Sequence, residues 1–560
     1  MNEMPRIGKG RKVGLPKGRQ LDDASLDEVR VALAGASLAR DRLIENLHLI
    51  QDMFGCIEAR HIRALGEEMR LSQAEVYEVA SFYDHFDVVR EGDAKPAPLT
   101  IRVCDSVSCM MNGANDIIAD LEESANPDLI RILRAPCMGR CATAPAARIG
   151  DREVDDASCD KLLEMADTGA FDVLVPDYVN LNAYREAGGY KLLARVRGGD
   201  VTPDDLMQML SDAGLRGLGG AGFPAGKKWG FVRSYPGPRL MTINGDEGEP
   251  GTFKDRHYLE RDPHRMFEGA IIAAHAVEAT RIYLYMRDEY PAVLAILRAE
   301  IEALELAELI EPGFIELRRG AGAYICGEES AMIESIEGKR GLPRHRPPYI
   351  AQVGLFGRPT LNHNVETLWW IRDIVEKGPK WFADQGKPGH PGARSWSVSG
   401  RVKNPGVKLA PAGITVRELI EEYSGGMLDG HTFKAYLPGG ASGGILPASM
   451  DDVALDFGDS LFKHGAFVGS HAVVIFSDHD NIKDVAINLI DFFAHESCGQ
   501  CTPCRGGTEK LAKLLRVDGK LDEGAIRDLE QVMRDASICG LGQAAPNPVN
   551  HLLTHFREDL

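Results

Sequence analysis

Hydrophobic positions recur with two different periods along the chain and divide it into segments. Between residues 21 and 95 the apolar side chains follow a helical period, as in "RDRLIENLHLIQDMFG", where Leu43, Leu47 and Ile50 share one face, and "AEVYEVASFYDHF" continues the pattern. The period changes at residue 99. There "LTIRVC" alternates like a strand, "NDIIADLEE" returns to a helix, and "IRILRAPC" alternates again. These patterns predict a helical segment followed by a small α/β unit.

The remaining chain shows three further patterns. A connector, "PDYVNLNAYREAGGYKLLARV", leads into a large glycine-rich α/β region at about 195–385. From about 395 to 475 the chain has short strands separated by turns, such as "SWSVSGRVKNPGVKL", "AYLPGG" and "AVVIF". Helical periods return from about 480 in "VAINLIDFFAHE" and "AIRDLEQVMRDAS". The predicted fold class is therefore α/β and multidomain.

Charge and hydropathy narrow the classes of partner. The formal net charge is −19 and the isoelectric point is near 5.4, which argues against nucleic acid or an anionic membrane as the main partner. No apolar run approaches the roughly 18 residues that a membrane span needs. The N-terminus, "MNEMPRIGKGRKVGLPKGRQ", is basic but has no apolar core, so it does not resemble a secretory signal. We expect a flexible basic tail over residues 1–20, with a docking arm as the alternative, and a cytoplasmic protein.

The 11 cysteines fall into a simple pattern. Eight of them form two sets of four: Cys104, Cys109, Cys137 and Cys141, and Cys498, Cys501, Cys504 and Cys539. An odd total without a signal peptide opposes a disulfide framework. The two sets are therefore interpreted as metal ligands in a reducing compartment.

The C-terminal set contains a C-x2-C-x2-C run. In bacterial-type iron–sulfur ligation a fourth cysteine follows three residues later, but position 508 is Thr. Cys539 is the remaining cysteine of this region, so we assign it as the fourth ligand. A three-plus-one distribution favours a [4Fe–4S] cluster, whereas structural zinc sites usually use two separated pairs. Zinc stays the alternative metal.

The N-terminal set contains two pairs. "CDSVSC" is C-x4-C and "CMGRC" is C-x3-C, and neither is the C-x-x-C of a thioredoxin-type redox pair. Two pairs on neighbouring loops suit a [2Fe–2S] cluster, in which each pair binds one iron. Zinc is again the alternative.

Three loops of the glycine-rich region carry candidate binding chemistry. In "GLGGAGFPAGKKWGF", Gly217, Gly219 and Gly222 match G-x-G-x-x-G, but the motif follows a predicted helix, which makes a standard Rossmann site unsuitable. Glycines still allow backbone N–H groups to approach an anionic or planar ligand closely. Lys227 and Lys228 could neutralise a phosphate there.

The other two loops are acidic. Asp246, Glu247 and Glu249 follow the predicted strand "RLMTIN", and ligands of open α/β sheets bind at the carboxyl ends of strands. The alternative interpretation is a solvated acidic turn. Glu328 and Glu329 lie in a third loop with glycines and basic and aromatic residues. Three such loops on one domain predict a site for two nucleotides.

These motifs together resemble one family. Residues from about 185 to 560 resemble the flavin- and NADH-binding 51-kDa-type subunit shared by respiratory complex I, NAD-reducing hydrogenases and NAD-dependent formate dehydrogenases. The resemblance rests on "GLGGAGFPAGKKW", "NGDEGEPGTFKDR", "GAYICGEES", "HNVETL" and "ESCGQCTPC". Residues 21 to about 178 resemble the usual 24-kDa-type thioredoxin-like [2Fe–2S] partner of that protein, fused in front.

The resemblance implies a domain plan. After the tail come a helical subdomain (21–97), a thioredoxin-like [2Fe–2S] domain (98–178), a Rossmann-like FMN- and NAD(H)-binding α/β domain (179–390), a ubiquitin-like β-grasp insert (391–477) and a helical [4Fe–4S] domain (478–560).

The resemblance also implies site residues. The FMN site falls on Gly217, Gly219, Lys228, Asn244, Asp246, Tyr324, Gly327, Asn364 and Thr367. The NAD site falls on Phe223, Phe231, Glu247, Glu249, Glu328, Glu329, Arg346 and Tyr349. In the family Glu249 lies near the nicotinamide amide and orients the ring, and no protein acid or base is needed for hydride transfer.

Four positions depart from the commonest family form. Leu218 replaces Arg, His363 replaces Asn, Arg346 replaces Lys and Tyr349 replaces Phe. Arg346 keeps the charge and Tyr349 keeps the ring, whereas a polar FMN contact from His363 is placed in doubt.

The expected function is electron transfer between iron–sulfur clusters and NAD+/NADH through FMN. The wording of "LPRHRPPYIAQVGLFGRPTL" and "YLPGGASGGILPASM" most resembles the β subunit of a formate dehydrogenase, whose partner would be a catalytic α subunit with a molybdenum or tungsten cofactor and further iron–sulfur clusters. The alternatives are the diaphorase subunit of an NAD-reducing hydrogenase or of an NADH-quinone oxidoreductase. A zinc-stabilised nucleotide-binding scaffold is the alternative from another class.

Overall fold

The computed structural model describes residues 18–517 and 519–560. Most of the predicted basic tail over 1–20 therefore lies outside the described residues. The chain forms two compact units. The first runs to Phe82 and resumes over Phe86–Pro96, and the second consists of Tyr83–His85 and Ala97–Leu560.

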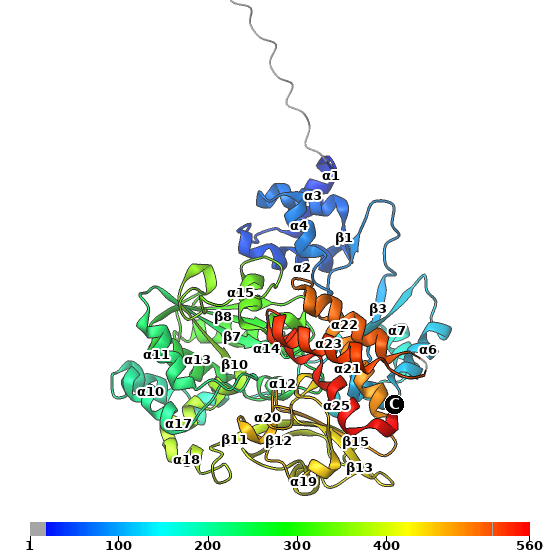
Figure 1. Cartoon of the computed structure of the whole chain (residues 1–560). Coiled ribbons are helices and arrows are strands. Elements are labelled where there is room, and N and C mark those ends of the chain that lie inside the picture. Colours follow the sequence, from blue (N-terminus) through cyan, green and yellow to red (C-terminus); the bar gives the residue numbers. More distant parts are fainter. Residues whose placement is uncertain (1–17, 518) are drawn as a thin grey trace, which may run out of the picture. The chain divides into compact units, whose positions relative to one another are not determined.

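The first unit is helical, as its apolar period predicts (Figure 1). Its helices are α1 (Asp23–Ala32), α2 (Leu43–Phe54), α3 (Ala59–Met69) and α4 (Gln73–Ala80), and its short strands β1 (Ile57–Glu58) and β2 (Val88–Val89) pair in parallel. The prediction that "AEVYEVASFYDHF" is helical throughout was wrong, because α4 ends at Ala80. The Ser81 hydroxyl donates to the Tyr77 carbonyl at 2.7 Å and so competes with further helical bonding.

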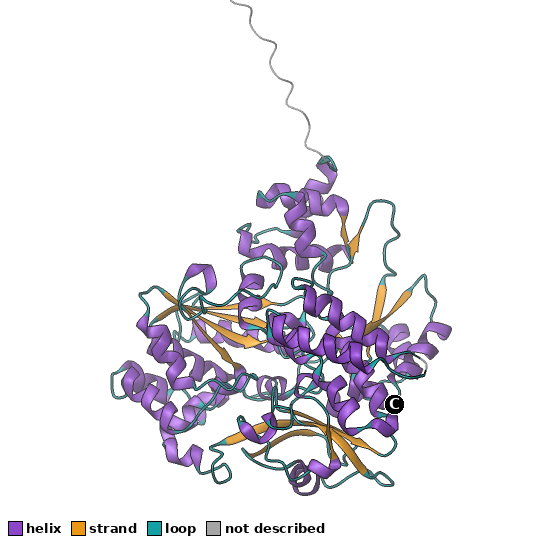
Figure 2. Cartoon of the chain, viewed as in Figure 1, coloured by secondary structure: helices purple, strands orange, loops and turns teal. Residues whose placement is uncertain are grey.

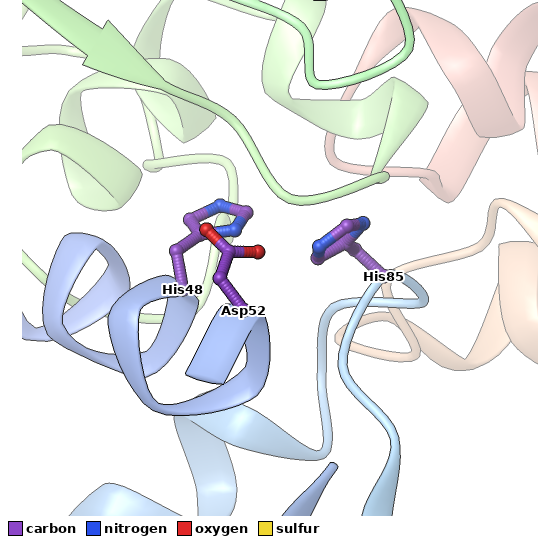
Figure 3. Close-up of side chains that lie close together, drawn as sticks. All are labelled: His48, Asp52 and His85. Atoms are coloured by element: carbon purple, nitrogen blue, oxygen red, sulfur yellow. The ribbon is translucent and has the colours of Figure 1, made fainter. Parts of the chain in front are cut away.

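The helix α2 carries a histidine and an aspartate one turn apart. His48 and Asp52 lie one turn apart and their side chains are close together in Figure 3. Residues four apart share a helix face. Two ligands on one helix do not complete a metal site, and we assign none to them.

The second unit begins with the small α/β sheet that the alternating segments predict. Its strands are β3 (Leu99–Cys104), β4 (Ile130–Ala135), β5 (Ala147–Ile149) and β6 (Arg152–Val154), in the order β4-β3-β5-β6. Helices α5 (Val107–Met111), α6 (Ala114–Ser124) and α7 (Cys159–Thr168) complete it. Strands β3 and β4 are parallel, with Cys104 opposite Ala135, so their carboxyl ends are neighbours.

A parallel sheet forms the centre of the glycine-rich region. Its strands are β7 (Arg239–Gly245), β8 (Ala279–Met286), β9 (Ile315–Arg319) and β10 (Thr360–Asn364), in the order β10-β7-β8-β9. The helices of this region are α8 (Leu181–Glu186), α9 (Lys191–Arg197), α10 (Pro203–Asp212), α11 (Ala225–Ser234), α12 (Lys254–Leu259), α13 (Pro263–Val277), α14 (Pro291–Leu306), α15 (Glu329–Ile336), α16 (Val365–Trp369), α17 (Ile371–Lys377) and α18 (Pro379–Ala383). Figure 2 shows these helices around the strands, an arrangement that buries both faces of a parallel sheet.

The segment of short strands forms a second, mixed sheet. Its strands are β11 (Ala393–Gly400), β12 (Gly406–Pro411), β13 (Phe433–Leu437), β14 (Leu446–Pro447) and β15 (Ala472–Ser477), in the order β12-β11-β15-β13-β14. The central pair, β11 and β15, is parallel, and the other pairs are antiparallel. Trp396, Tyr436 and Ile475 belong to its buried core.

The chain ends in a helical bundle. Its helices are α21 (Ile482–His495), α22 (Thr502–Leu515), α23 (Glu523–Ala536), α24 (Gly540–Ala544) and α25 (Asn547–His555). Their apolar faces meet in the interior, where Leu489, Leu511 and Ile526 are fully buried. Across the described ranges, every helix is too short or too polar to cross a bilayer.

Candidate functional site

A cavity of about 310 Å³ brings the three predicted loops together. Six residues of the expected FMN set line it: Gly219, Asn244, Asp246, Tyr324, Gly327 and Asn364. Three residues of the expected NAD set also line it: Glu247, Glu249 and Glu328. The carboxyl ends of β7 and β10 and the segment after β9 supply most of these side chains, as expected for an open parallel sheet.

Glycines let the loops approach one another closely around this cavity. A Cβ on Gly219 would lie 3.0 Å from Asn364 Cβ, and a Cβ on Gly327 would lie 3.3 Å from the Asp246 carbonyl. Asn244 stabilises the contact between Gly327 and Asp246. Its Nδ2 donates to the Gly327 carbonyl at 2.9 Å, and its Oδ1 accepts from the Asp246 N–H at 3.0 Å. The glycine-rich loop follows α10 and leads into α11, which confirms that it is not the strand-to-helix turn of a standard Rossmann site.

Asp246 carries an unsatisfied acceptor in the cavity wall. Its Oδ2 is buried and has no hydrogen-bond partner. Burial raises the pKa of this carboxyl well above its ordinary value. A buried acceptor without a partner is costly, and a ligand hydroxyl would satisfy it.

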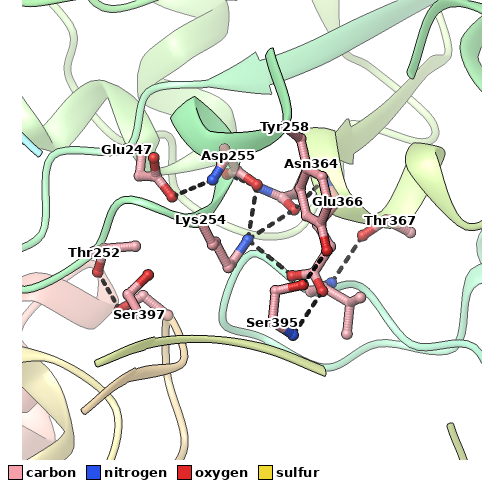
Figure 4. Close-up of polar contacts among 12 residues, drawn as sticks. Glu247, Thr252, Lys254, Asp255, Tyr258, Asn364, Glu366, Thr367, Ser395 and Ser397 are labelled. Atoms are coloured by element: carbon pink, nitrogen blue, oxygen red, sulfur yellow. Dashed lines mark hydrogen bonds and ion pairs between the residues drawn. The ribbon is translucent and has the colours of Figure 1, made fainter. Parts of the chain in front are cut away.

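A buried lysine organises the polar floor of the cavity (Figure 4). Lys254 Nζ lies 2.8 Å from Asp255 Oδ1, 3.2 Å from Glu366 Oε2 and 3.3 Å from Asn364 Oδ1. Asn364 Nδ2 donates to the other Asp255 oxygen at 2.6 Å. The lysine is 1% exposed and lines the cavity, so it is a fixed positive charge beside any anionic or electron-rich ligand.

Glu247 lines the cavity, but its carboxylate already has protein partners. It accepts from the backbone N–H groups of Asp255 at 2.8 Å and Arg256 at 3.1 Å, at the start of α12. Tyr290 Oη donates to it at 3.1 Å. Burial, with a contribution from Asp255, raises the pKa of Glu247 to about 7.

The Glu249 carboxylate is held by Ser442, a residue of the segment that forms the mixed sheet. Its Oε1 accepts from the Ser442 N–H at 2.8 Å and from the Ser442 hydroxyl. Burial raises the pKa of Glu249, and the Ser442 bonds oppose that shift. Two donors to one oxygen fix its direction, which is what an orienting carboxylate requires.

The remaining predicted residues lie outside the cavity lining and form its surroundings. Lys228 Nζ is 3.5 Å from Glu329, and Arg346 pairs with both Glu328 and Glu329. The Glu328 carboxylate also accepts from the first N–H groups of α15.

Two of the outlying residues shape the glycine-rich loop itself. Gly217 N–H donates to the Phe223 carbonyl at 2.8 Å, and Thr367 Oγ1 accepts from the Leu218 N–H at 2.9 Å. Both bonds are internal to the protein, so these residues position the loop.

Three predicted aromatic residues are exposed. Phe223, Phe231 and Tyr349 are 44%, 55% and 59% exposed, and the centroids of the two phenylalanine rings lie 6.2 Å apart. Exposed rings offer faces for a planar ligand.

His363, one of the four departures from the family form, is buried and hydrogen-bonded within the protein. Its Nε2 accepts from the Trp229 indole at 2.7 Å, and burial holds the pKa of the imidazole well below its usual value. The side chain therefore stays neutral and partnered within the protein.

The C-terminal cysteines meet at the starts of two helices. Cys501 precedes α22, Cys504 lies in its first turn, and Cys539 precedes α24. A Cβ on Gly542 would lie 2.8 Å from Cys504 Cβ, so α24 packs directly against the C-x2-C-x2-C run. Burial, with the nearby Cys498, raises the pKa of Cys539 to about 12.

This cysteine site adjoins the cavity. Gly540, Leu541 and Ala544, which follow Cys539, belong to the cavity lining. The arrangement fits the predicted three-plus-one set of cluster ligands.

The N-terminal cysteines meet at the carboxyl ends of β3 and β4. Cys104 ends β3, Cys109 lies in α5, and Cys137 and Cys141 follow β4. The sulfurs of Cys137 and Cys141 are 3.4 Å apart, and all four thiols are buried and free of disulfides. The donor set fits a [2Fe–2S] cluster.

Some cavity residues were not predicted from the sequence. They include Thr252, Lys254, Asp255, Ser442, Phe467, Ser470 and Leu541. Lys254 and Asp255 stand inside the quoted motif "NGDEGEPGTFKDR", so the motif was a usable signal for them. Ser442 and Phe467 come from the second sheet region, and no local pattern connects them to the cavity.

Comparison with known families identifies the class. Residues 210–373 match the Nuo51 FMN-binding domain of the complex I 51-kDa type, and residues 484–560 match the NADH-ubiquinone oxidoreductase-F iron–sulfur binding region. Residues 30–169 match the thioredoxin-like [2Fe–2S] ferredoxin. The chain thus combines an FMN-binding domain, a [4Fe–4S] domain and a [2Fe–2S] domain.

The chain belongs to the family of NADH-quinone oxidoreductase F subunits, the complex I 51-kDa type. It is 43% identical to the F 2 subunit of the NADH-quinone oxidoreductase of Rhizobium meliloti (strain 1021), over 69% of this chain and 95% of the relative. It is 40% identical to the F subunit of the Aquifex aeolicus (strain VF5) enzyme, over 69% of this chain and 91% of the relative. The air-oxidized crystal structure of an NAD+-reducing [NiFe]-hydrogenase contains a chain with 33% identity and a TM-score of 0.80, with 92% of each chain covered.

The residues of the cavity fit FMN. The unpartnered oxygen of Asp246 suits a hydroxyl of a sugar-alcohol chain, the glycines give backbone access, and Lys254 provides a buried positive charge. Bound FMN would supply conversion between two-electron hydride chemistry and one-electron transfer to iron–sulfur clusters.

Proposed function

We propose that this chain is a diaphorase subunit that transfers electrons between NAD(H) and iron–sulfur clusters through FMN. The observation that carries the proposal is the cavity itself. It gathers three loops of the FMN-binding domain and is bordered by the residues that follow Cys539. In this proposal the chain binds and orients the cofactor and the nicotinamide, and Glu249 directs the nicotinamide amide. The predicted FMN, NAD and cysteine residues are adopted as the site residues.

A reconstitution experiment tests this function. The purified chain is loaded with FMN, iron and sulfide under anaerobic conditions, and reduction of ferricyanide by NADH is measured. We expect NADH-dependent turnover that requires FMN. A preparation that contains flavin and iron but shows no turnover would refute the proposal, and one that binds zinc without flavin would support the scaffold alternative.

The domain layout supports a hydrogenase-type partner. The hydrogenase chain corresponds to this chain over 92% of its length, including the fused N-terminal domains, whereas the F subunits cover 69% of this chain. We therefore place a subunit of an NAD-reducing hydrogenase first and a subunit of an NADH-quinone oxidoreductase second. The order of the mixed sheet, β12-β11-β15-β13-β14, supports the proposal that residues 391–477 are a β-grasp insert.

A formate dehydrogenase partner with molybdenum or tungsten is the remaining candidate. It is supported by the resemblance of the stretches "LPRHRPPYIAQVGLFGRPTL" and "YLPGGASGGILPASM" to formate dehydrogenase β subunits. The hydrogenase-type partner has the stronger support. Isolation of the intact complex, followed by NAD+ reduction assays with hydrogen and with formate, separates the two. The 11 free cysteines support a reducing, cytoplasmic location.

A further inference from the structure

Three residues of the FMN-binding domain contact both the cysteine loop after β4 and the Glu247 segment of the cavity. They are Arg256 of α12, Arg287 after β8, and Tyr290 at the start of α14. We call them the bridging triad. None of them was singled out by the sequence, and none lines the cavity.

The triad holds the loop that carries Cys137 and Cys141. Arg287 Nη2 donates to the Cys137 carbonyl at 2.6 Å, and Arg256 Nε donates to the Gly139 carbonyl at 3.0 Å. Tyr290 packs directly on Gly139, where a Cβ would lie 2.0 Å from the phenol oxygen. Gly139 also has φ +67°, a left-handed conformation that favours glycine.

The same three residues hold Glu247. Arg287 Nη1 donates to the Glu247 carbonyl, and Tyr290 Oη donates to Oε2 at 3.1 Å. The backbone N–H of Arg256 donates to the same oxygen, also at 3.1 Å. Glu247 in turn lines the cavity. A shift of the cysteine loop therefore has to be accommodated at Glu247.

Burial makes this connection stiff and electrostatically strong. Arg287 is 3% exposed, Tyr290 is 1% exposed and Glu247 is 5% exposed. Although burial opposes its charge, the nearby Glu289 carboxylate helps to hold the pKa of Arg287 well above its usual value. A fixed positive charge in a water-poor interior is weakly screened, so it acts on both neighbouring sites.

We propose that the bridging triad couples the [2Fe–2S] site to the FMN cavity, so that occupancy of the cavity by FMN changes the midpoint potential of the [2Fe–2S] cluster. This inference rests on the proposed assignments of Cys137 and Cys141 as cluster ligands and of the cavity as the FMN site. Coupling between two sites is reciprocal, so the oxidation state of the cluster must change the affinity for FMN by the same factor.

The test is a redox titration of the full chain. The reduced [2Fe–2S] cluster is followed by its EPR signal, with FMN bound and after its removal. At a fixed applied potential we expect FMN to change the reduced-to-oxidised ratio by at least about fivefold, the lower end of usual coupling. In Arg287→Met the change should fall below about twofold.

A matched control separates the effect of losing Arg287 from the general effect of losing a buried arginine. Arg318 is equally buried, lies 2.9 Å from Glu316 and donates to the Ile336 carbonyl at 3.0 Å. Arg318→Met should therefore keep the full FMN effect. If Arg287→Met keeps it as well, the inference is wrong.

A second variant guards against loss of the cluster in Arg287→Met. Tyr290→Phe removes the hydroxyl alone and should reduce the FMN effect while the EPR signal persists. An unchanged effect in Tyr290→Phe overturns the inference when Arg287→Met does not assemble. A wild-type chain that binds both groups without coupling overturns this inference alone, whereas a wild-type chain that binds no FMN, or no [2Fe–2S] cluster, overturns the site assignments and the inference together.

Discussion

Replacing Lys254 with methionine should strongly destabilise the FMN-binding domain. The ammonium group lies between Asp255 at 2.8 Å and Glu366 at 3.2 Å, and all three side chains are buried. Methionine fills similar space but carries no charge. Lys254→Met would therefore leave two carboxylates buried without their cation.

The size of the effect follows from this burial. Removing one partner of a buried ion pair costs about 3–5 kcal/mol, because the other charge stays desolvated. Each 1.4 kcal/mol is a factor of ten in an equilibrium constant. We therefore expect the folded-to-unfolded ratio to fall by a factor of roughly 100 or more.

Urea denaturation followed by circular dichroism measures this change in the free energy of unfolding. Lys387→Met is the control, because Lys387 pairs with Glu418 at a side chain that is 35% exposed, and such pairs are worth about 0–1 kcal/mol. The double variant Lys254→Met with Glu366→Gln should recover part of the loss. If Lys254→Met costs no more than Lys387→Met, or the second change recovers nothing, the buried-charge reasoning is refuted.

Three further predictions follow from single positions. Asp246→Ala should weaken FMN binding about 5- to 150-fold, since a buried ligand hydroxyl left without its partner costs about 1–3 kcal/mol, and an unchanged Kd in a flavin fluorescence titration would contradict this. Cys539→Ala should abolish the [4Fe–4S] EPR signal while FMN and the [2Fe–2S] signal persist, and unchanged iron content would show that the ligand assignment is wrong. Burial raises the pKa of Glu530 to about 7 from 4.5. Its folded pKa is thus above its unfolded pKa, so the stability of the wild type relative to Glu530→Gln should fall as the pH rises from 4.5 to 7. Parallel stability curves of the two proteins would count against this prediction.

The secondary structure around the cysteines was predictable because it depends on local patterns. The alternation in "LTIRVC" and "IRILRAPC" predicted β3 and β4; Cys104 ends the first strand, and Cys137 follows soon after the second. Strands with alternating burial carry a period that neighbours in the sequence reveal. The spacing of Cys498, Cys501 and Cys504 is likewise a local signal, since it sets which thiols one helix start can present.

Contacts between distant segments were not predictable in the same way. Ser442 lies 193 residues from Glu249, and its two bonds to that carboxylate depend on how the second sheet packs. Arg287 and Tyr290 stand in an ordinary strand-to-helix connection, "RDEY", whose composition indicates nothing about a cluster. Glu247 was predicted to contact NAD, but the sequence could not show that the start of α12 already binds its carboxylate.

The two cysteine sites differ in how they reach the cavity, and this difference carries a functional consequence. The residues after Cys539 line the cavity themselves, so the proposed [4Fe–4S] site is its direct neighbour. The Cys137 loop is linked to Glu247 through Arg287, Arg256 and Tyr290, and Cys137 and Cys141 also pack with Phe253. A cluster site that shares residues with the cavity wall suits electron exchange with FMN. A cluster site that is linked to the cavity through hydrogen bonds suits adjustment of the affinity for FMN and of the midpoint potential of the cluster. Loss of the C-terminal cluster should therefore stop electron delivery, and loss of the bridging contacts should change the energies at which it occurs.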